Sequence, residues 1–261
     1  MGVASLGSGS RGNGTLVAVG GAVFLVDCGF NLKQTEQRLA RLQLSPGDLS
    51  AILVSHEHSD HIAGVTALSH RYGIPVFASY GTLNNGPKAF SCTAFDGDVP
   101  VEVAGVVVNP GVVPHDAREP TQFVLQHDGM KIGVLSDLGS ITEHVVTQFS
   151  DCDYLLLEAN HDRAMLQRGS YPPALKRRVG GDHGHLSNTQ ALELLTRIAH
   201  AGLHVVIGHV SEQNNDLDLV ESLFAPLRPQ LASLSIATQK EGQEWIGEQP
   251  MTRQISFDKV I

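Results

Sequence analysis

The sequence predicts a single α/β domain. Short apolar runs typical of strands alternate with stretches of helical periodicity, glycines separate the early runs, and no repeat, low-complexity tract or charged linker divides the chain. The 261 residues are 42% hydrophobic and 17% charged, which suits a compact core and excludes extended disorder. We therefore expect one domain over residues 1–261, in which helices pack on mixed strands.

Strand signals recur along the whole chain. They are β-branched and apolar runs bounded by glycine, proline or polar turn residues. Strands are expected at Val3–Leu6, Thr15–Val19, Ala22–Val26, Ala51–Val54, Pro75–Ala78, Val101–Val108, Gln122–Gln126, Lys131–Leu135, Tyr154–Glu158, His204–Ile207 and Ala232–Ile236.

Helical periodicity marks five other stretches. In the first of them Leu32, Leu39 and Leu42 share one helical face, as core-facing residues do. Helices are expected at Asn31–Leu42, Asp60–Tyr72, Ile141–Phe149, Asn188–Ala201 and Asp216–Phe224.

The charge balance and the cysteines restrict the classes of function. A formal net charge of −9 argues against a protein that coats DNA nonspecifically, although bound divalent cations would supply positive charge for a nucleic-acid enzyme. Cys28, Cys92 and Cys152 are scattered without a CxxC motif, which is typical of reduced thiols in the cytoplasm. No export signal or membrane-spanning run is evident, so we expect a cytoplasmic protein.

The strongest chemical signal is His56-x-His58-x-Asp60-His61, directly after the apolar strand Ala51–Val54. On an extended loop, residues 56 and 58 point to the same side, and the last two residues begin a helix and can turn toward a second ion. Imidazole and carboxylate groups are ligands for zinc, manganese or iron. A solvated polar loop is the ordinary alternative, but four ligating side chains in six residues favour a metal site.

Three later residues are candidates to complete two coordination shells. His115 follows a β-run, and Asp137 and His209 each close an apolar strand. Residues at strand ends project from one edge of a sheet, where binding sites gather. Each of the three alone is also typical of a hydrogen-bonded turn residue. Their occurrence in order after the first motif favours a shared metal site.

In this order the motifs resemble those of the metallo-β-lactamase superfamily. The resemblance implies an αββα four-layer sandwich, with two mixed β-sheets flanked by helices, and two divalent metal ions. It also implies a role for Asp27 in bracing the histidine loop, for which a simple turn aspartate is the alternative. The implied ligands are His56, His58 and His115 for one metal, Asp60, His61 and His209 for the other, and Asp137 as the bridge.

One position departs from the secreted zinc β-lactamases, which commonly have cysteine where this chain has Asp137. A carboxylate can bridge two ions at about 3.5–4 Å, the spacing of two-metal hydrolysis. The site then resembles that of glyoxalase II-like thioesterases and phosphodiesterases. Antibiotic hydrolysis is therefore not expected.

Residues outside the metal motifs bear on the substrate. The loop with Ser10, Arg11 and Asn13 could cradle phosphate oxygens or form an ordinary hairpin turn. His185 lies just before a helix that opens on a Ser187-to-Gln190 capping box, where it could protonate a leaving oxygen or simply pack.

The segment Lys176-Arg177-Arg178 is the densest cationic cluster of an acidic chain. It would suit a nucleic-acid backbone, and a solvated helix face explains it as well.

Over nearly the whole chain the sequence resembles the WalJ/YycJ-type group of bacterial hydrolases, whose features appear here as Gly7–Asn13, His56–His61, Glu158–Asp162, Tyr171-Pro172, Lys176–Arg178, Gly184–Asn188 and His209–Asn215. This resemblance implies a cytoplasmic 5′-to-3′ DNA exonuclease linked to mismatch repair, with manganese as an activating ion. From the ligand types we expect two divalent ions, zinc or manganese with iron a further option, which would activate a hydroxide. The resemblance implies nucleic acid as the partner and names no protein partner. Catalytic roles are expected for Asp60 and for Glu158 and His185, which match a glutamate and a histidine that cooperate in tRNA 3′-end-processing enzymes, where Glu158 would orient His185 and His185 would protonate the leaving group. The implied substrate contacts are Ser10, Arg11, Asn13, Asn160, His161, Arg177, Arg178 and Asn215.

Two alternatives remain open from the sequence. The same seven ligands would serve a small-molecule hydrolase that acts on a thioester or a lactone. A non-catalytic binding protein that keeps the fold is disfavoured by the complete ligand set.

Overall fold

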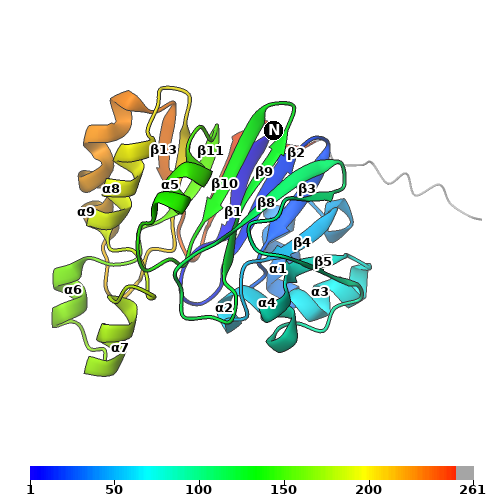
Figure 1. The fold of residues 1–261 in the computed structure, drawn as a ribbon, viewed down its shortest axis with the longest axis horizontal. Coiled ribbons are helices and arrows are strands. Elements are labelled where there is room, and N and C mark those ends of the chain that lie inside the picture. The colour runs from blue at the N-terminus through cyan, green and yellow to red at the C-terminus, as the bar shows by residue number, and fades with distance from the viewer. Residues whose placement is uncertain (251–261) are drawn as a thin grey trace, which may run out of the picture.

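The computed structural model describes residues 1–250, which fold into two seven-stranded sheets that face each other (Figure 1). The single domain predicted over residues 1–261 stays a prediction, since 251–261 lie outside the described residues. The first sheet has the order β14 (Gln243–Gly247), β1 (Gly2–Gly7), β2 (Gly14–Val19), β3 (Ala22–Val26), β4 (Ala51–Val54), β5 (Val76–Ser79), β6 (Cys92–Phe95). The second has the order β13 (Ser233–Ile236), β12 (His204–Gly208), β11 (Tyr154–Glu158), β10 (Met130–Leu135), β9 (Thr121–His127), β8 (Val106–Val112), β7 (Val101–Val103).

Both sheets are mixed in the same way. In the first sheet the strands from β14 to β3 pair antiparallel, and those from β3 to β6 pair parallel. In the second sheet the strands from β7 to β10 pair antiparallel, and those from β10 to β13 pair parallel. Parallel strands need crossover connections, which bring helices onto the faces of the sheets.

Helices cover the outer face of each sheet, so the chain forms four αββα layers (Figure 1). α1 (Leu32–Arg41) and α3 (Val65–Tyr72) pack on the first sheet, and α5 (Glu143–Phe149), α8 (Asn188–Ile198) and α9 (Leu217–Phe224) pack on the second. The remaining helices are α2 (Ser59–Ile62), α4 (Tyr80–Asn85), α6 (Arg163–Arg168) and α7 (Pro173–Val179), with short 3₁₀ turns at Pro46–Asp48 and Ala225–Gln230. No helix among residues 1–250 is long and apolar enough to cross a membrane.

The central strands are apolar along their whole length because both of their faces are buried. In β4, Ala51 and Leu53 point into the core between the sheets, and Ile52 and Val54 point into the core under the helices. All four side chains are fully buried. The predicted bounds of this strand are confirmed at both ends. The predicted αββα architecture is also confirmed.

Two predicted elements are wrong in detail. The helix expected over Asp60–Tyr72 is interrupted at Gly64, whose N–H donates to the carbonyl of Cys28 and where a Cβ atom would lie 2.0 Å from the carbonyl oxygen of Phe30. The strand expected over Val101–Val108 is a hairpin, because Ala104 and Gly105 both take positive φ and form a two-residue turn.

The elements that the sequence did not reveal are short. Strands β6 and β14 lie at the sheet edges and carry several exposed side chains, so they lack the continuous apolar pattern. Helix α7 buries none of its residues, and α6 buries only Leu166.

Candidate metal centre

The loops that follow β3, β4, β10 and β12 meet at one edge of the sandwich, beside α2 (Figure 1). They carry Asp27, the His56–His61 segment, Asp137 and His209. The carboxyl ends of parallel strands form such an edge, which is where open α/β sheets bind ligands. Asp27, Asp137 and His209 adopt left-handed backbone conformations, with φ of 62°, 53° and 51°. Non-glycine residues rarely do so, and these positions turn the chain sharply off each strand.

One group of donors is formed by three imidazoles from distant segments. Nδ1 of His58 lies 2.9 Å from Nε2 of His56 and 3.3 Å from Nε2 of His115. Nδ1 of His115 lies 2.9 Å from the carbonyl oxygen of Gly184 and must donate to it, so Nε2 of that ring presents a lone pair. Nitrogen lone pairs at such distances repel one another unless a cation or a proton lies between them. The geometry therefore fits a tris-histidine metal site.

A second group lies on the other side of Asp137. The Nδ1 atom of His61 donates to Asp27 at 2.7 Å, which turns its Nε2 toward Oδ2 of Asp60 at 3.5 Å. The same Asp60 oxygen lies 3.9 Å from Nε2 of His209. This set of one carboxylate and two imidazoles also suits a divalent transition metal.

Asp137 lies between the two groups and reaches both. Its Oδ2 is 3.2 Å from Nε2 of His61, and its Oδ1 is 3.9 Å from Nε2 of His115. Burial would raise the pKa of Asp137, but His209 and His61 outweigh it and hold that pKa well below its usual range. The carboxylate is thus ionised and placed to bridge two ions. All seven residues predicted as ligands are brought together, and they fit the pair of ions that the resemblance implies.

The two groups of imidazoles differ in their affinity for protons. Burial, with His61 nearby, lowers the pKa of His56 well below its usual value, and burial also lowers the pKa of His115. Burial would lower the pKa of His209 too, but Asp137 raises it to about 10. A metal ligand must be a neutral imidazole, and the directions of these shifts favour that form at His56 and His115 and oppose it at His209.

Neighbouring polar groups hold the ligands in place. Asp27 also accepts from the backbone N–H of Ser55 at 2.8 Å and from its hydroxyl at 2.7 Å, which ties β3 to the histidine loop. Gly29 packs so closely on this loop that a Cβ atom there would lie 1.7 Å from the carbonyl oxygen of Asp60. The backbone N–H of His209 donates to the hydroxyl of Ser8 at 2.6 Å. Such outer contacts orient metal ligands and tune their basicity.

Glu158 and His185 form a pair beside Asp137. Oε2 of Glu158 lies 3.2 Å from Nδ1 of His185, whose ring is one-fifth exposed, whereas the carboxylate is fully buried. Burial would raise the pKa of Glu158, but His185 and further hydrogen bonds lower it to about 2. The buried carboxylate therefore orients the ring of His185 through its Nδ1 atom.

The metal-site residues open into a pocket of about 260 Å³. Its single lysine or arginine among residues 1–250 is Arg178, which comes from α7. Two nitrogens of the Arg178 guanidinium donate to the two carboxylate oxygens of Asp116. Asp116 directly follows the candidate ligand His115, and Oδ1 of Asp116 lies 3.5 Å from Nε2 of His115. The sequence reasoning missed Asp116, Ser55 and Ser8, whose signal was only their adjacency to ligands and to the glycine-rich loop.

The three predicted substrate contacts of the early loop lie in different environments. Ser10 lines the pocket. Arg11 is exposed and pairs with Glu212 at 2.6 Å. The amide of Asn13 is buried and lies 3.3 Å from Oδ2 of Asp60 and 3.2 Å from Nε2 of His61, so it positions ligands.

Three further predicted contacts are buried. Asn160 donates to the carbonyl of His209 at 3.1 Å, and Asn215 donates to the carbonyl of Ala159 at 2.9 Å. These amides hold the loop of the last ligand and face the protein interior, so we assign them to positioning instead of substrate contact. His161 is 2% exposed and its Nδ1 has no hydrogen-bond partner among residues 1–250. Arg177 lies outside the pocket and lines a neighbouring one.

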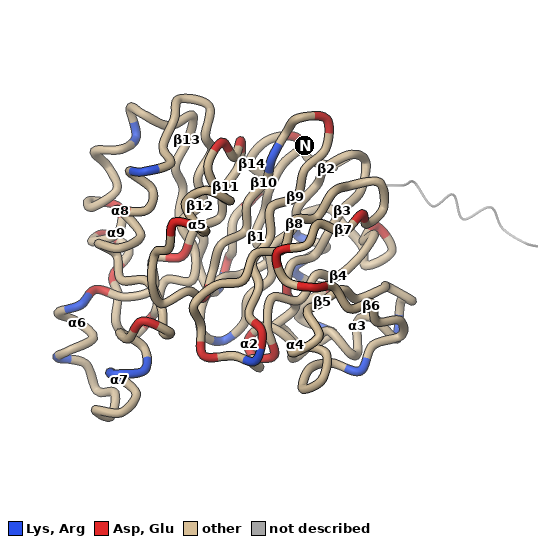
Figure 2. The backbone as a smooth tube through the Cα atoms, in the orientation of Figure 1, with Lys and Arg blue, Asp and Glu red and all other residues tan. Residues whose placement is uncertain are grey.

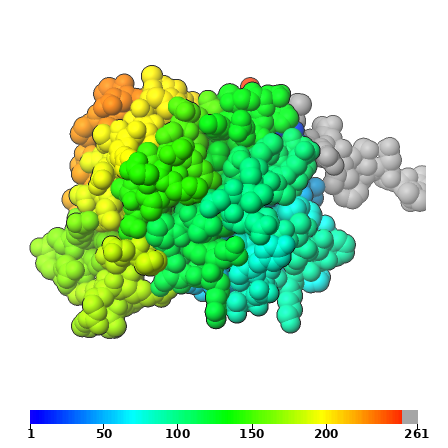
Figure 3. All heavy atoms as spheres, in the orientation of Figure 1, coloured from blue at the N-terminus to red at the C-terminus, as the bar shows by residue number. Residues whose placement is uncertain are grey.

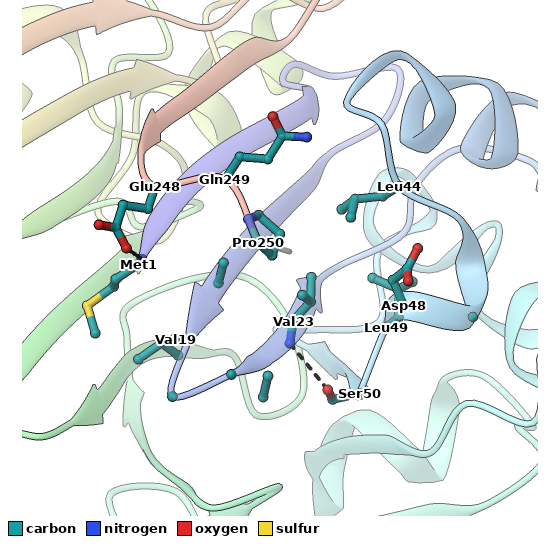
Figure 4. A pocket seen from close by; sticks show the side chains of 15 residues that line it. Met1, Val19, Val23, Leu44, Asp48, Leu49, Ser50, Glu248, Gln249 and Pro250 are labelled. Atoms are coloured by element: carbon teal, nitrogen blue, oxygen red, sulfur yellow. Dashed lines mark hydrogen bonds and ion pairs between the residues drawn. The ribbon is translucent and has the colours of Figure 1, made fainter. Parts of the chain in front are cut away.

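A larger cavity of about 400 Å³ lies between the β2–β3 turn and the segment around Asp48 (Figure 4). Backbone, aliphatic side chains and the carboxylates of Asp48 and Glu248 line it. No histidine or cysteine lines it within the described part of the chain, so it lacks the donors of the metal edge.

The sequence model of the β-lactamase superfamily domain matches residues 23–209, from β3 to the last histidine of the site. The chain belongs to the metallo-β-lactamase superfamily. With the clustered histidine and aspartate donors, this membership makes it a metal-dependent hydrolase.

Named relatives of this superfamily match most of the chain. An exodeoxyribonuclease YycJ of Bacillus anthracis is 34% identical over 82% of this chain and 84% of its own. An exodeoxyribonuclease WalJ of Streptococcus pneumoniae is 33% identical over 82% and 83%. The crystal structure of Zn²⁺-bound PqqB from Methylobacterium extorquens has the same fold, with a TM-score of 0.71 at 17% identity over 95% of this chain and all of that one.

Proposed function

We propose that the chain hydrolyses phosphodiester bonds in nucleic acid, and that it is a DNA exonuclease that digests in the 5′-to-3′ direction. The pairing of buried Glu158 with His185 at the wall of the metal pocket carries this proposal. A thioester releases a thiolate, which is a good leaving group and has little need of such a proton donor. A lactone releases an alkoxide, and it is disfavoured instead by the two relatives named exodeoxyribonucleases. A phosphodiester releases an alkoxide, which leaves far more readily once it is protonated.

The residues of the chain divide the work of this reaction. Glu158 accepts from Nδ1 of His185, so Nε2 of that ring is the atom that gives a proton to the departing oxygen. Arg178, held by Asp116, offers its guanidinium to a non-bridging phosphate oxygen in the pocket. Asp60 and Asp137 would hold divalent ions, and such ions would supply positive charge for the phosphate.

Two divalent ions fit the seven donors. When bound, they would supply a hydroxide nucleophile at neutral pH and positive charge for the transition state. His56, His58 and His115 would hold one ion, and the second would be held by the remaining ligands, with Asp137 shared between them. Zinc, manganese and iron all suit imidazole and carboxylate ligands.

The finer parts of the proposal rest on the named relatives. Two proteins called exodeoxyribonucleases, at 33–34% identity over most of the chain, support DNA as the substrate and attack from an end. The direction of digestion, a role in DNA repair and a cytoplasmic location follow only from the resemblance of the motifs to that group.

The test is digestion of end-labelled single- and double-stranded DNA and RNA in the presence of manganese or zinc. A label at the 5′ end should appear first in mononucleotides, whereas a label at the 3′ end should persist in shortening fragments. A thioester and a lactone serve as comparison substrates. Turnover of these compounds, with every nucleic acid left intact, would contradict the proposal.

A further inference from the structure

Residues 163–180, which comprise α6, α7 and their connection, form an arm that projects beside the metal edge (Figures 1 and 3). The arm contains five of the 18 lysines and arginines of the chain and none of its 27 acidic residues. Figure 2 shows blue, basic positions along both α6 and α7. Such a surface attracts a polyanion despite the net charge of −9.

Packing does not account for these basic residues. Helix α7 buries none of its seven residues, so the core places no demand on its surface. Within residues 1–250, no ion pair or side-chain hydrogen bond engages Arg168 or Arg177, and both are exposed. The other cations of the arm have partners: Arg163 donates to Ser187, Lys176 to the carbonyl of Gln167, and Arg178 to Asp116.

Consecutive residues of α7 line two different cavities. Arg178 and Val179 line the metal pocket, whereas Lys176, Arg177 and Gly180 line a neighbouring cavity of about 530 Å³ between α6 and α7. Successive helical residues point about 100° apart, so one helix can present cations to both sides. The end of the arm is tied to the catalytic wall, because the N–H of His185 donates to the carbonyl of Val179 at 2.9 Å.

We propose that this arm binds the phosphate backbone of the same strand whose end lies in the metal pocket. Arg178 contacts the phosphate next to the cleaved bond, and Arg177 and Arg168 contact phosphates further along the strand, on the other side of α7. The arm thus makes the enzyme prefer a polynucleotide to a short phosphodiester. The inference rests on the proposed function for the identity of the ligand, but binding by the arm does not require cleavage.

The experiment compares wild-type protein with an Arg168→Gln/Arg177→Gln variant, and with Lys131→Gln as a control for charge. Lys131 lies near the start of β10, at the other end of that strand from Asp137. The probe is a fluorescent single-stranded DNA of 12 nucleotides, whose dissociation constant is measured with EDTA present at 50–200 mM KCl. Hydrolysis of bis(p-nitrophenyl) phosphate with manganese reports on the metal pocket alone.

Each phosphate contact to a single strand contributes about 0.7 to the slope of log affinity against log salt. The double variant should lose about 1.4 from that slope, so the wild-type affinity should fall about sevenfold more than the variant affinity over this salt range. The control should match the wild type, and all three should hydrolyse the small probe equally. A salt slope that the double variant leaves unchanged would overturn the proposed arm. If the arm governs DNA binding while the wild-type protein cleaves neither probe, the arm stands and the proposed activity falls.

Discussion

Replacement of Glu158 by glutamine removes one buried charge and changes little else in shape. In the structure Oε1 accepts from the N–H groups of Leu138 at 3.1 Å and Leu186 at 2.8 Å, and Oε2 accepts from the N–H of Asp137 at 3.0 Å. A glutamine keeps one acceptor oxygen but turns an NH₂ group toward a second donor. Its carboxamide also cannot accept from His185 on that side.

The expected loss of stability follows from these contacts. One hydrogen bond to a charged group is worth about 1.5–3 kcal/mol, and a buried N–H without a partner costs about 1–3 kcal/mol. Because the two terms overlap, we expect Glu158→Gln to lower the free energy of unfolding by about 2–4 kcal/mol. In a chain of this length, that shift lowers the melting temperature by roughly 5–15 °C.

The same change should lower activity well below the melting temperature. Loss of a carboxylate that orients a histidine typically costs about 10–100-fold, so we expect such a loss in kcat/KM for a phosphodiester. Thermal unfolding and initial rates at 20 °C measure the two effects, with the exposed Glu193→Gln on α8 as the control. A Glu158→Gln variant that melts and turns over like the control would refute this account of the buried carboxylate.

Three further predictions concern other groups. His185→Ala should reduce kcat by about 10²–10⁴-fold on a nucleic acid when rates are compared well below the melting temperature of the variant, and an unchanged rate would remove this histidine from proton transfer. Burial lowers the pKa of His161 to about 4, so between pH 4 and the usual pKa of 6.5 the unfolded chain binds more protons than the folded chain, and the free energy of unfolding falls as the pH falls. His161→Phe should flatten that decline, measured by urea titration at several pH values. Parallel pH dependences in the variant and the wild type would contradict the burial argument. Burial also raises the pKa of Cys28 to about 11 and that of Cys152 to about 12, whereas Cys92 is exposed. A thiol reagent at pH 8 should therefore label Cys92 rapidly and the other two cysteines only on unfolding. Rapid reaction of all three would disprove the buried positions.

The parts of the fold that the sequence predicted are those in which packing dictates composition. β4 is buried on both faces and reads as four apolar residues, and α8 begins at the expected capping box of Ser187 and Gln190. The break at Gly64 was not predictable in the same way. It depends on a close approach to the carbonyl of Phe30, a tertiary contact that leaves no periodic pattern.

The convergence of the seven candidate metal ligands was predictable because chemistry restricts their residue types and strand ends restrict their positions. Asp116 could not be assigned in this way, because its role is to accept hydrogen bonds from Arg178, which lies 62 residues later in the chain. The buried amides of Asn160 and Asn215 show the converse. Their motif resembles that of the relatives, but only the coordinates reveal that both side chains face the backbone of the site and not its opening.

Metal content tests the central claim most directly. We predict two tightly held divalent ions per chain by elemental mass spectrometry of purified, dialysed protein, with at most one retained after Asp137→Ala and none after Asp137→Ala is combined with His56→Ala. Folding of the variants is checked by circular dichroism. A wild-type chain that holds no ion when supplied with zinc or manganese, or variants that retain both, would contradict a centre in which seven side chains from distant segments converge on a pair of cations.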